Sequence, residues 1–540
     1  MSKPLWWQGA VIYQIYPRSL NDTNGDGIGD IPGIIEKMDY IASLGVDAIW
    51  VSPFFKSPMK DFGYDISDYR DIDPQFGTLD DFDTLIETAH RANIKVIIDQ
   101  VISHTSDQHD WFLQSRQSRD NDKADWYVWA DPQADGTPPN NWMSLFGGVA
   151  WEWEPRREQY YLHNFLSSQP DLNFHNPAVR QQILDEVEFW LQRGVDGLRL
   201  DAINFCFHDQ QLRNNPAKPP EKRQGRGFSE DNPYAFQYHY YNNTRPENLG
   251  FLEDLRALLN RYPGTVSLGE ISAEDSLATM AEYTQGDKRL HTAYSFELLV
   301  DDFSADYIRS TVSTLEQRIQ GGWPCWAVGN HDVARVMSRW GGPNPSADLA
   351  KMVNAMLGSL KGSLCSYQGE ELGLPEADIP FEQLQDPYGI TFWPNFKGRD
   401  GCRTPIPWNP SGAEAGFSTG TPWLPITDAH RNLSVEQQDR DPGSVLNHYR
   451  QFMHWRREQP ALRWGDIEFL DAPDNVLLFI RRHQQQTLLV AFNLNDHACQ
   501  LALPEGIDAL CGHGIEGAEL AQTTLRLPAH GAFYGQGANL

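Results

Sequence analysis

Strand-like and helix-like segments alternate along the first part of the chain, and this alternation restricts the possible folds more than any other sequence feature. Apolar runs at 11–16, 48–51 and 95–101 are short enough for buried strands. Amphipathic segments at 34–44 and 82–92 separate them. Such a rhythm predicts a parallel sheet that is covered by helices.

Five further strand-like runs bring the expected number of strands to eight. They lie at 197–203, 265–271, 293–298, 325–329 and 363–367, with helical patterns between them. Eight strands that alternate with helices predict an α/β fold of the (β/α)8 TIM-barrel type. In such a barrel the carboxyl ends of all strands open on one face, so residues that are distant in the chain meet there.

Irregular stretches and a late change of pattern divide the chain. A region rich in Asp, Pro and Trp predicts an inserted subdomain after the third strand, because so long a loop is uncommon within a compact domain. Short alternating strands near the end predict a C-terminal antiparallel β-sandwich domain. The expected parts are the barrel at 1–103 and 173–463, the inserted subdomain at 104–172, long loops at 207–248 and 372–432, and the C-terminal domain at 464–540.

Composition argues against several classes of partner. The net charge of -29 would repel a nucleic acid or an anionic membrane, so we expect neither as a partner. The six cysteines form no CxxC pair and no framework spacing, which predicts free, buried thiols of a reducing compartment. We see no signal peptide and no apolar stretch of about 20 residues, so a cytoplasmic protein is expected, either a monomer or a homodimer.

Acidic side chains follow several of the predicted strands. Asp201 and Glu270 end adjacent strands, and retaining glycoside cleavage needs a nucleophilic carboxylate and a proton donor about 5 Å apart. Arg199 lies two residues before Asp201 and points to the same side, where its charge would keep that carboxyl ionised. Each acid alone could be a solvated charge or a structural ion pair. Together with Asp332 and the neutral donors His104 and His331, they favour chemistry on glycosides.

The segments 99–104, 197–201, 268–270 and 330–332 resemble the four signature regions of glycoside hydrolase family 13, the α-amylase family. The further segments 62–65, 169–173 and 398–405 resemble its α-glucosidase and oligo-1,6-glucosidase group. The likeness runs from about Trp6 into the C-terminal β domain. It implies that Asp201 is the nucleophile, Glu270 the acid/base and Asp332 the stabiliser of the transition state.

The same resemblance implies a set of contacts with the glucosyl unit. They are Tyr64, Asp65, His104, Arg199, His331 and Arg399. Asp65 and Arg399 resemble the pair that holds the non-reducing end, which would make a blind pocket and release one glucose at a time. We add Phe146 and Phe165 as aromatic faces for the sugar, although core packing is the alternative for aromatic residues of this chain.

Ala202 is a candidate determinant of linkage preference. In the resembling group Val at this position goes with α-1,6 preference, and Ala or Thr with α-1,4 preference. Because Ala202 directly follows Asp201, we expect its side chain to face away from Asp201 along the strand and to shape the acceptor side. One methyl-scale change discriminates between substrates by about 1–3 kcal/mol.

Residues 22–30 form the candidate metal loop. Side-chain oxygens of Asp22, Asn24, Asp26 and Asp30, with the carbonyl of Ile28, could surround a structural Ca²⁺ ion. Gly33 stands where an EF-hand would have Glu, so we reject that motif, and a solvated turn without metal is the alternative. Members of the resembling group carry such a loop site. Ser103 replaces the Asn that binds a second calcium in many amylases, and we expect no organic cofactor.

The expected function is that of a retaining exo-acting α-glucosidase for small α-glucosides, with α-1,4 linkages favoured and transglucosylation possible. Oligo-1,6-glucosidase, sucrose hydrolase, trehalose synthase and trehalose-6-phosphate hydrolase are alternatives in the same family, and the last would need a cationic phosphate site. A non-catalytic amino-acid-transporter subunit with a similar barrel would carry a transmembrane segment and degraded acids. The sequence shows neither.

Overall fold

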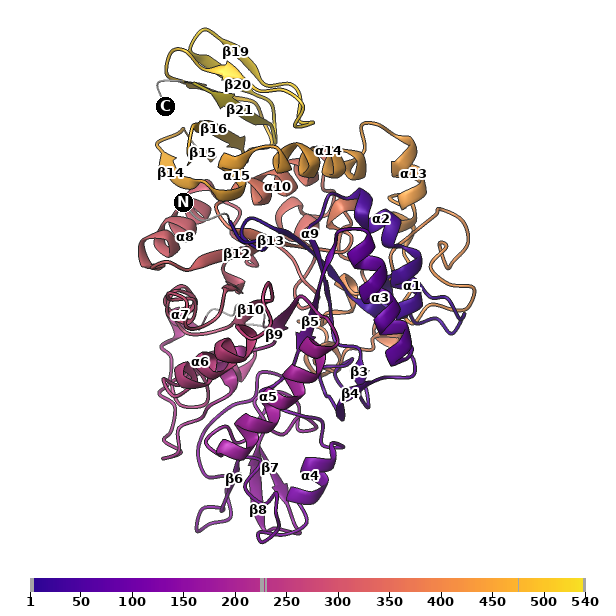
Figure 1. Ribbon diagram of the computed structural model, residues 1–540, viewed down its shortest axis with the longest axis vertical. Helices are drawn as coiled ribbons and strands as arrows, with labels where there is room; N and C mark the ends of the chain where they lie inside the picture. Colours follow the sequence, from indigo (N-terminus) through magenta and orange to yellow (C-terminus); the bar gives the residue numbers. More distant parts are fainter. Residues whose placement is uncertain (1–3, 224–227, 229–230, 474, 538–540) are drawn as a thin grey trace.

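The computed structural model describes residues 4–223, 228, 231–473 and 475–537. Its centre is a closed parallel barrel with the strand order β1-β13-β12-β11-β10-β9-β5-β2, which confirms the predicted TIM barrel (Figure 1). The barrel strands are β1 (Val11–Ile15), β2 (Ala48–Val51), β5 (Lys95–Gln100), β9 (Gly197–Leu200), β10 (Val266–Ile271), β11 (Thr292–Ser295), β12 (Trp323–Ala327) and β13 (Ser363–Tyr367). Side chains such as Ile12, Trp50 and Leu268 fill the interior.

Helices cover the outside of the barrel. The larger ones are α3 (Leu79–Arg91), α5 (Pro177–Gln192), α6 (Asn248–Leu259), α7 (Ser276–Tyr283), α8 (Ala305–Arg318), α10 (Ala347–Ser359) and α14 (Val445–Arg457). Shorter ones are α4 (Asp110–Ser115), α9 (Val336–Gly341), α11 (Pro387–Phe392), α12 (Asp428–Arg431), α13 (Val435–Arg440) and α15 (Pro460–Trp464). Local signals set their starts: Thr78 and Asp81 form a capping box before α3, and Asn176 caps α5.

The helix expected at 34–44 differs from the prediction. Two short helices occupy this region, α1 (Ile31–Glu36) and α2 (Met38–Ser43), with Lys37 between them. The first begins earlier than expected because the Asp30 carboxylate accepts the Gly33 N–H and Pro32 stands in the first turn.

The inserted segment after β5 has a small sheet of its own. Its strands β6 (Trp129–Ala130), β7 (Trp151–Glu154) and β8 (Gln159–Leu162) pair in the order β6-β8-β7, and they lie at the bottom of Figure 1. A two-stranded sheet of β3 (Phe55–Lys56) and β4 (Asp68–Ile72) follows β2. Both sheets lie outside the barrel and belong to the connections that surround its carboxyl-terminal face.

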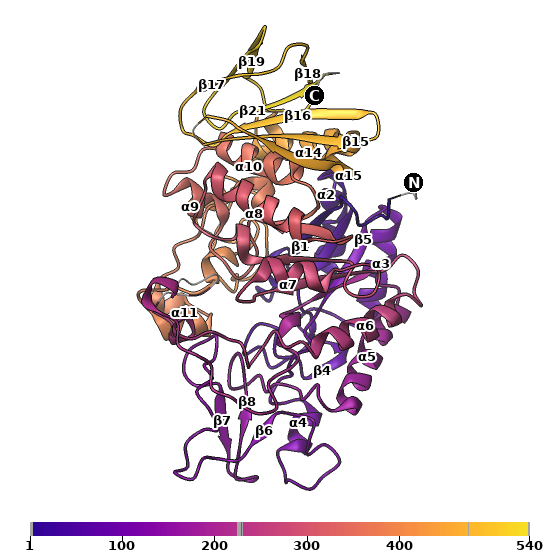
Figure 2. The ribbon, with the colours of Figure 1, turned by 90° about the vertical axis from the view of Figure 1, so that its left-hand side faces the viewer.

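The C-terminal region is antiparallel, as predicted. A five-stranded sheet has the order β14-β15-β16-β21-β18, and a three-stranded sheet the order β17-β20-β19. Leu501 and Leu525 of the smaller sheet share a buried cluster with Leu478 and Leu489 of the larger one, so the two sheets form a sandwich, seen at the top of Figure 2. The strands are β14 (Asp466–Leu470), β15 (Val476–His483), β16 (Gln486–Asn493), β17 (Cys499–Ala502), β18 (Asp508–Ala509), β19 (Glu519–Ala521), β20 (Thr524–Leu527) and β21 (Ala532–Gln536).

All six cysteines are free thiols, as the sequence predicts. Four of them are buried, but Cys499 is half-buried and Cys511 is exposed, so the expectation of burial is wrong for these two. Both lie in the smaller and more open C-terminal domain. Across the described ranges, every helix is too short or too polar to span a membrane.

Candidate active site

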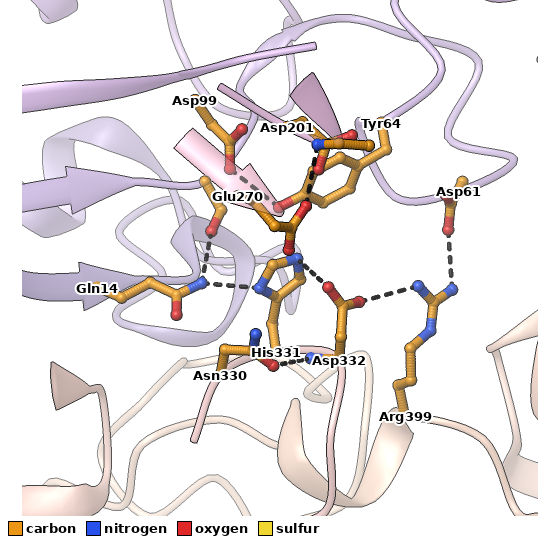
Figure 3. Close-up of polar contacts among 12 residues, drawn as sticks. Gln14, Asp61, Tyr64, Asp99, Asp201, Glu270, Asn330, His331, Asp332 and Arg399 are labelled. Carbon is orange, nitrogen blue, oxygen red and sulfur yellow. Dashed lines mark hydrogen bonds and ion pairs between the residues drawn. The ribbon is translucent and has the colours of Figure 1, made fainter. Parts of the chain in front are cut away.

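A pocket opens at the carboxyl ends of the barrel strands, where the predicted acids meet. Asp201 directly follows β9, Glu270 lies in β10, and Asp332 follows β12. The three side chains converge in Figure 3 although 131 residues separate the first from the last. The residues that line this pocket are Asp61, Tyr64, His104, Leu145, Phe146, Phe165, Gln169, Asp201, Ala202, Phe205, Phe228, Glu270, Ser272, Phe296, His331, Asp332, Tyr388 and Arg399.

Arg199 joins the two predicted catalytic carboxylates. Its fully buried guanidinium places Nη1 2.6 Å from Asp201 Oδ1 and Nη2 2.5 Å from Glu270 Oε1. The same Nη1 lies 2.9 Å from Oδ1 of Asp99. Because Asp201 and Glu270 contact the two terminal nitrogens of one planar group, their carboxyl groups are neighbours, as the retaining mechanism with its spacing of about 5 Å requires.

Burial governs the ionisation of these acids. Desolvation raises the pKa of Asp201 to about 7, although Arg199 opposes it. Arg199 lowers the pKa of Asp201, in the direction expected of a cation that keeps this carboxyl ionised, but burial outweighs it because one cation is shared by three buried carboxylates. Desolvation, strengthened by the charges of Asp201 and Asp332, raises the pKa of Glu270 to about 8. Glu270 is thus the last of these acids to lose its proton, which suits a proton donor.

Asp332 has the opposite environment. Its Oδ1 accepts hydrogen bonds from Arg399 Nη1 and Arg403 Nη2, both at 3.1 Å. Burial opposes its ionisation, but His331 and these guanidinium groups hold the pKa of Asp332 well below its usual range. Asp332 is therefore an anion at neutral pH.

His331 is positioned from both sides, as Figure 3 shows. Gln14 Nε2 donates to His331 Nδ1 at 2.8 Å, so the ring proton is on Nε2, which lies 3.3 Å from Asp332 Oδ2. The ring of Tyr64 stacks on His331 with centroids 5.1 Å apart, and its hydroxyl donates to Asp99. Burial lowers the pKa of His331 far below neutrality, so the ring is neutral, as predicted.

His104 also lines the pocket as a neutral ring. Burial lowers its pKa to about 4. Its Nε2 lies 2.9 Å from the Tyr64 carbonyl, and its Nδ1 lies 3.0 Å from Ser103 Oγ. Ser103, which stands where many amylases have a calcium-binding Asn, thus orients His104.

The acid that pairs with Arg399 is Asp61 and not Asp65. Arg399 Nη2 lies 2.8 Å from Asp61 Oδ1, and Asp386 binds the other edge of the guanidinium. Asp65 is fully buried outside the pocket lining, where its carboxylate accepts the backbone N–H groups of Lys60 and Asp61. The predicted pair of Asp65 and Arg399 is therefore wrong. Asp61 directly precedes the segment 62–65, and the tight turn of this segment directs the Asp65 carboxylate onto the backbone N–H groups of Lys60 and Asp61.

Ala202 lines the pocket, as predicted, but its position does not follow from strand alternation. The strand β9 ends at Leu200, so Ala202 is outside the pleat. Its backbone lies in the left-handed region with φ 39°, and its N–H donates to Glu270 Oε2 at 3.0 Å. The side-chain direction predicted from strand alternation is therefore wrong, and Ala202 orients Glu270 through its backbone N–H.

Two of the aromatic candidates line the pocket as expected. Phe146 lies under Arg399, with 5.1 Å from the guanidinium carbon to the ring centroid. Phe165 packs between His104 and Phe205, at 5.2 and 5.3 Å. Phe205, Phe296, Tyr388 and Gln169 also line the pocket and were not predicted from the sequence. Gln169 belongs to the segment 169–173, whereas Phe205, Phe296 and Tyr388 lie in short helical turns that carry no sequence signal.

The loop 22–30 is wound around its own side chains. Asp22 Oδ1 accepts the N–H groups of Asn24 and Gly25, Asn24 Oδ1 accepts that of Asp26, and Asp26 Oδ1 accepts that of Ile28. Asp30 accepts the N–H of Thr23 and caps α1. Within the part of the chain that the structure describes, no group of three or more His, Cys, Asp or Glu side chains converges as a metal site. The loop therefore offers oxygen donors, but its side chains also satisfy its own backbone.

Comparisons with known proteins agree with this geometry. Residues 14–465 match the alpha amylase catalytic domain, and residues 467–533 match the maltogenic amylase C-terminal domain. A probable alpha-glucosidase of Rhizobium meliloti (strain 1021) is 52% identical over 98% of this chain and 97% of its own length. An oligo-1,6-glucosidase of Heyndrickxia coagulans is 38% identical over 93% of this chain and 94% of its own length.

Solved structures show the same relationship. An alpha-glucosyl transfer enzyme, XgtA, has a TM-score of 0.98 and 64% identity, with 99% of this chain and 100% of that chain covered. The trehalulose synthase MutB from Pseudomonas mesoacidophila MX-45 has a TM-score of 0.89 and 31% identity, with 99% and 100% covered. The sequence matches, the barrel and the four strand-end motifs together show that this chain belongs to glycoside hydrolase family 13, the α-amylase family.

Proposed function

We propose that this protein is a retaining, exo-acting α-glucosidase that removes the terminal non-reducing glucosyl unit of short α-glucosides and can transfer it to other acceptors. One observation carries the proposal. Arg199 holds Asp201 and Glu270 side by side in a pocket, and the ion pair of Arg399 with Asp61 lies in the wall of the same pocket.

The two carboxyl groups divide the reaction into two displacements. In the first, Asp201 attacks the anomeric carbon while protonated Glu270 donates its proton to the glycosidic oxygen that departs. In the second, ionised Glu270 takes a proton from water or from an acceptor hydroxyl, which attacks the same carbon and releases Asp201. Two inversions at one carbon retain the α configuration.

Asp332 acts on the glucosyl unit as positive charge develops on the ring. Its anionic carboxylate stays fixed by Arg399 and Arg403, so no reorganisation is needed when the transition state forms. The stacked rings of Tyr64 and His331 supply a flat face and a neutral donor beside it. We assign these groups to binding of the glucosyl unit.

The glucose side of the pocket is suited to a chain end. Asp61, Asp386 and Phe146 surround Arg399, so charged and aromatic groups make up this wall of the pocket. Arg399 is the one Arg or Lys among the described residues of the lining, and carboxylates already pair with it. This pairing favours neutral α-glucosides over a phosphorylated disaccharide.

A product assay tests the proposal. Maltose, isomaltose, sucrose and trehalose would be supplied at equal concentration, with chromatography of the sugars and polarimetry of the released glucose. We expect the highest kcat/KM for maltose, because Ala202 leaves room on the acceptor side, and α-glucose as the first product. Initial release of β-glucose, or conversion of sucrose into an isomer without free glucose, would contradict this assignment.

We further propose that loop 22–30 binds one structural Ca²⁺ ion. Asp22, Asn24, Asp26 and Asp30 with the Ile28 carbonyl offer the hard oxygen donors that this ion prefers. The ion would stabilise the loop and take no part in the chemistry. Exhaustive chelation should then lower Tm and leave kcat nearly unchanged, because an ion bound only by the folded state stabilises it. An unmoved melting curve together with a metal-free elemental analysis would make the loop a simple turn.

A further inference from the structure

The long loop at 207–248, here called the acceptor loop, is fastened to the inserted segment by buried asparagines. Asn242 Nδ2 donates to Asn164 Oδ1 at 2.8 Å, and Asn215 Nδ2 donates to Asn242 Oδ1 at 2.9 Å. Asn215 and Asn242 themselves do not line the pocket. They hold the loop in place without charge.

Asn232 differs from these asparagines because its partners belong to the pocket wall. Its side chain is fully buried, and its Nδ2 donates to the Leu145 carbonyl at 2.6 Å and to the Tyr388 hydroxyl at 3.2 Å. Its Oδ1 accepts the Tyr234 N–H at 3.0 Å. One amide thus joins the acceptor loop to the inserted segment and to the loop that carries α11. A second contact, from Asn395 Nδ2 to Asp231 Oδ2 at 3.0 Å, connects the same two loops nearby.

The contacts of Asn232 continue to the glucose side of the pocket. The ring of Tyr388 meets the edge of Phe146 at 5.1 Å, and Phe146 lies beneath Arg399. The Tyr388 N–H donates to Asp386, which in turn holds the Arg399 guanidinium. A displacement of Asn232 would therefore also displace Tyr388 and Phe146, which lie in the wall of the pocket.

We propose that Asn232 is a positioning residue that sets how the glucosyl-enzyme divides between water and a sugar acceptor. This inference rests on the proposed double displacement at Asp201. Asn232 holds the pocket wall that contains Leu145, Tyr388 and Phe146 in one position, and we infer that this fixed wall keeps loose water from the glucosyl-enzyme while an acceptor sugar is bound. When the Asn232 amide is removed, the Leu145 carbonyl and the Tyr388 hydroxyl each lose a hydrogen bond from a buried donor. Both groups then bind water instead, and water beside the glucosyl-enzyme favours hydrolysis.

The partition can be measured with p-nitrophenyl α-glucoside as donor and cellobiose, which has no α-glucosidic bond, as acceptor. Nitrophenol counts every glucosyl-enzyme formed, and free glucose counts those that react with water. The ratio of transfer to hydrolysis is set after this intermediate forms, so it does not depend on the amount of folded protein. In Asn232→Ala we expect the ratio to fall by about fivefold, the factor that one net buried hydrogen bond represents.

Two further variants make the test specific. Asn232→Asp keeps the size of the side chain but loses the N–H donor, so its ratio should fall as well. Asn215→Ala is the matched control, because it removes a buried asparagine of the same loop that does not contact the pocket wall. It should lower Tm and keep the wild-type ratio.

The outcomes separate the inference from the proposed function. An unchanged ratio in both Asn232 variants, or an equal fall in Asn215→Ala, would show that Asn232 only fastens the loop and would overturn the inference. Equal amounts of nitrophenol and glucose from the wild type at every cellobiose concentration would also overturn it, and leave the glucosidase assignment intact. A wild type that releases no nitrophenol would contradict the assignment itself.

Discussion

The catalytic centre and the rim of the pocket are held together by different forces. In the centre, Arg199 binds three carboxylates that stand on or directly after neighbouring barrel strands. At the rim, the acceptor loop meets other loops through neutral amides such as Asn232 and through aromatic rings. Loss of one partner of a buried ion pair costs about 3–5 kcal/mol, whereas neutral contacts can be exchanged at smaller cost. Chemistry therefore resides in the barrel, and selectivity in the loops that it carries.

Replacement of the nucleophile should give the largest effect of all. In Asp201→Asn no glycosyl-enzyme can form, so kcat should fall by several orders of magnitude on every substrate. The fold should persist, since Asp99 and Glu270 still pair with Arg199. The kcat on maltose, measured in a stopped assay, tests the loss of activity, and a melting curve of the same variant tests whether the fold persists. Activity close to that of the wild type would remove the proposed mechanism.

Loss of the proton donor should depend on the leaving group. Glu270→Gln cannot protonate a departing sugar, so maltose should suffer far more than p-nitrophenyl α-glucoside. The pKa of Glu270 is raised to about 8, so the protonated, active form of the wild type is lost as the pH rises through that value. In the wild type, kcat/KM should therefore fall as the pH rises through about 8, and in Glu270→Gln this fall should be absent. Equal losses on both substrates, or an unchanged fall with pH, would exclude Glu270 as the acid.

Variants of Asp61 and Asp65 distinguish an acid that lines the pocket from one that only stabilises the turn beside it. Asp61→Asn removes a partner of Arg399 and should lower kcat/KM for all α-glucosides alike, on the order of a hundredfold, since such a loss costs about 2–5 kcal/mol. Asp65→Asn leaves backbone N–H groups of its turn without a full acceptor, so Tm should fall while KM changes little. Reversed results would restore Asp65 as the sugar contact.

The smallest effect is expected at Ala202, where the centre and the rim meet. Ala202→Val should raise the ratio of kcat/KM for isomaltose over maltose by an amount on the order of 1–3 kcal/mol. A β-branched residue at φ 39° is also strained, so Tm should fall. Ala202→Thr is the control, because it carries the same branching and strain but goes with α-1,4 preference in the resembling group. If both variants shift the ratio equally, strain and not side-chain chemistry is responsible.

Much of the fold could be predicted because its signals are local. The cap at Asn176, the apolar runs of the barrel strands and the alternation near the C-terminus each act within a few residues. The interruption at Lys37 could not be predicted, because no Pro or Gly stands at or beside this position to mark the break. The same distinction applies to the site, where strand-end motifs located Asp201, Glu270 and Asp332.

The sequence by itself determined the barrel and the acids at its strand ends, because short-range periodicity sets the strands and parallel strands open on one face. Tertiary structure alone decided that Asp61 rather than Asp65 meets Arg399, since the turn between them directs one carboxylate inward. It also decided that burial outweighs Arg199 at Asp201, because desolvation depends on everything that surrounds a group. The contacts of Asn232 join three loops that are far apart in the chain, and no local pattern of residues carries such information.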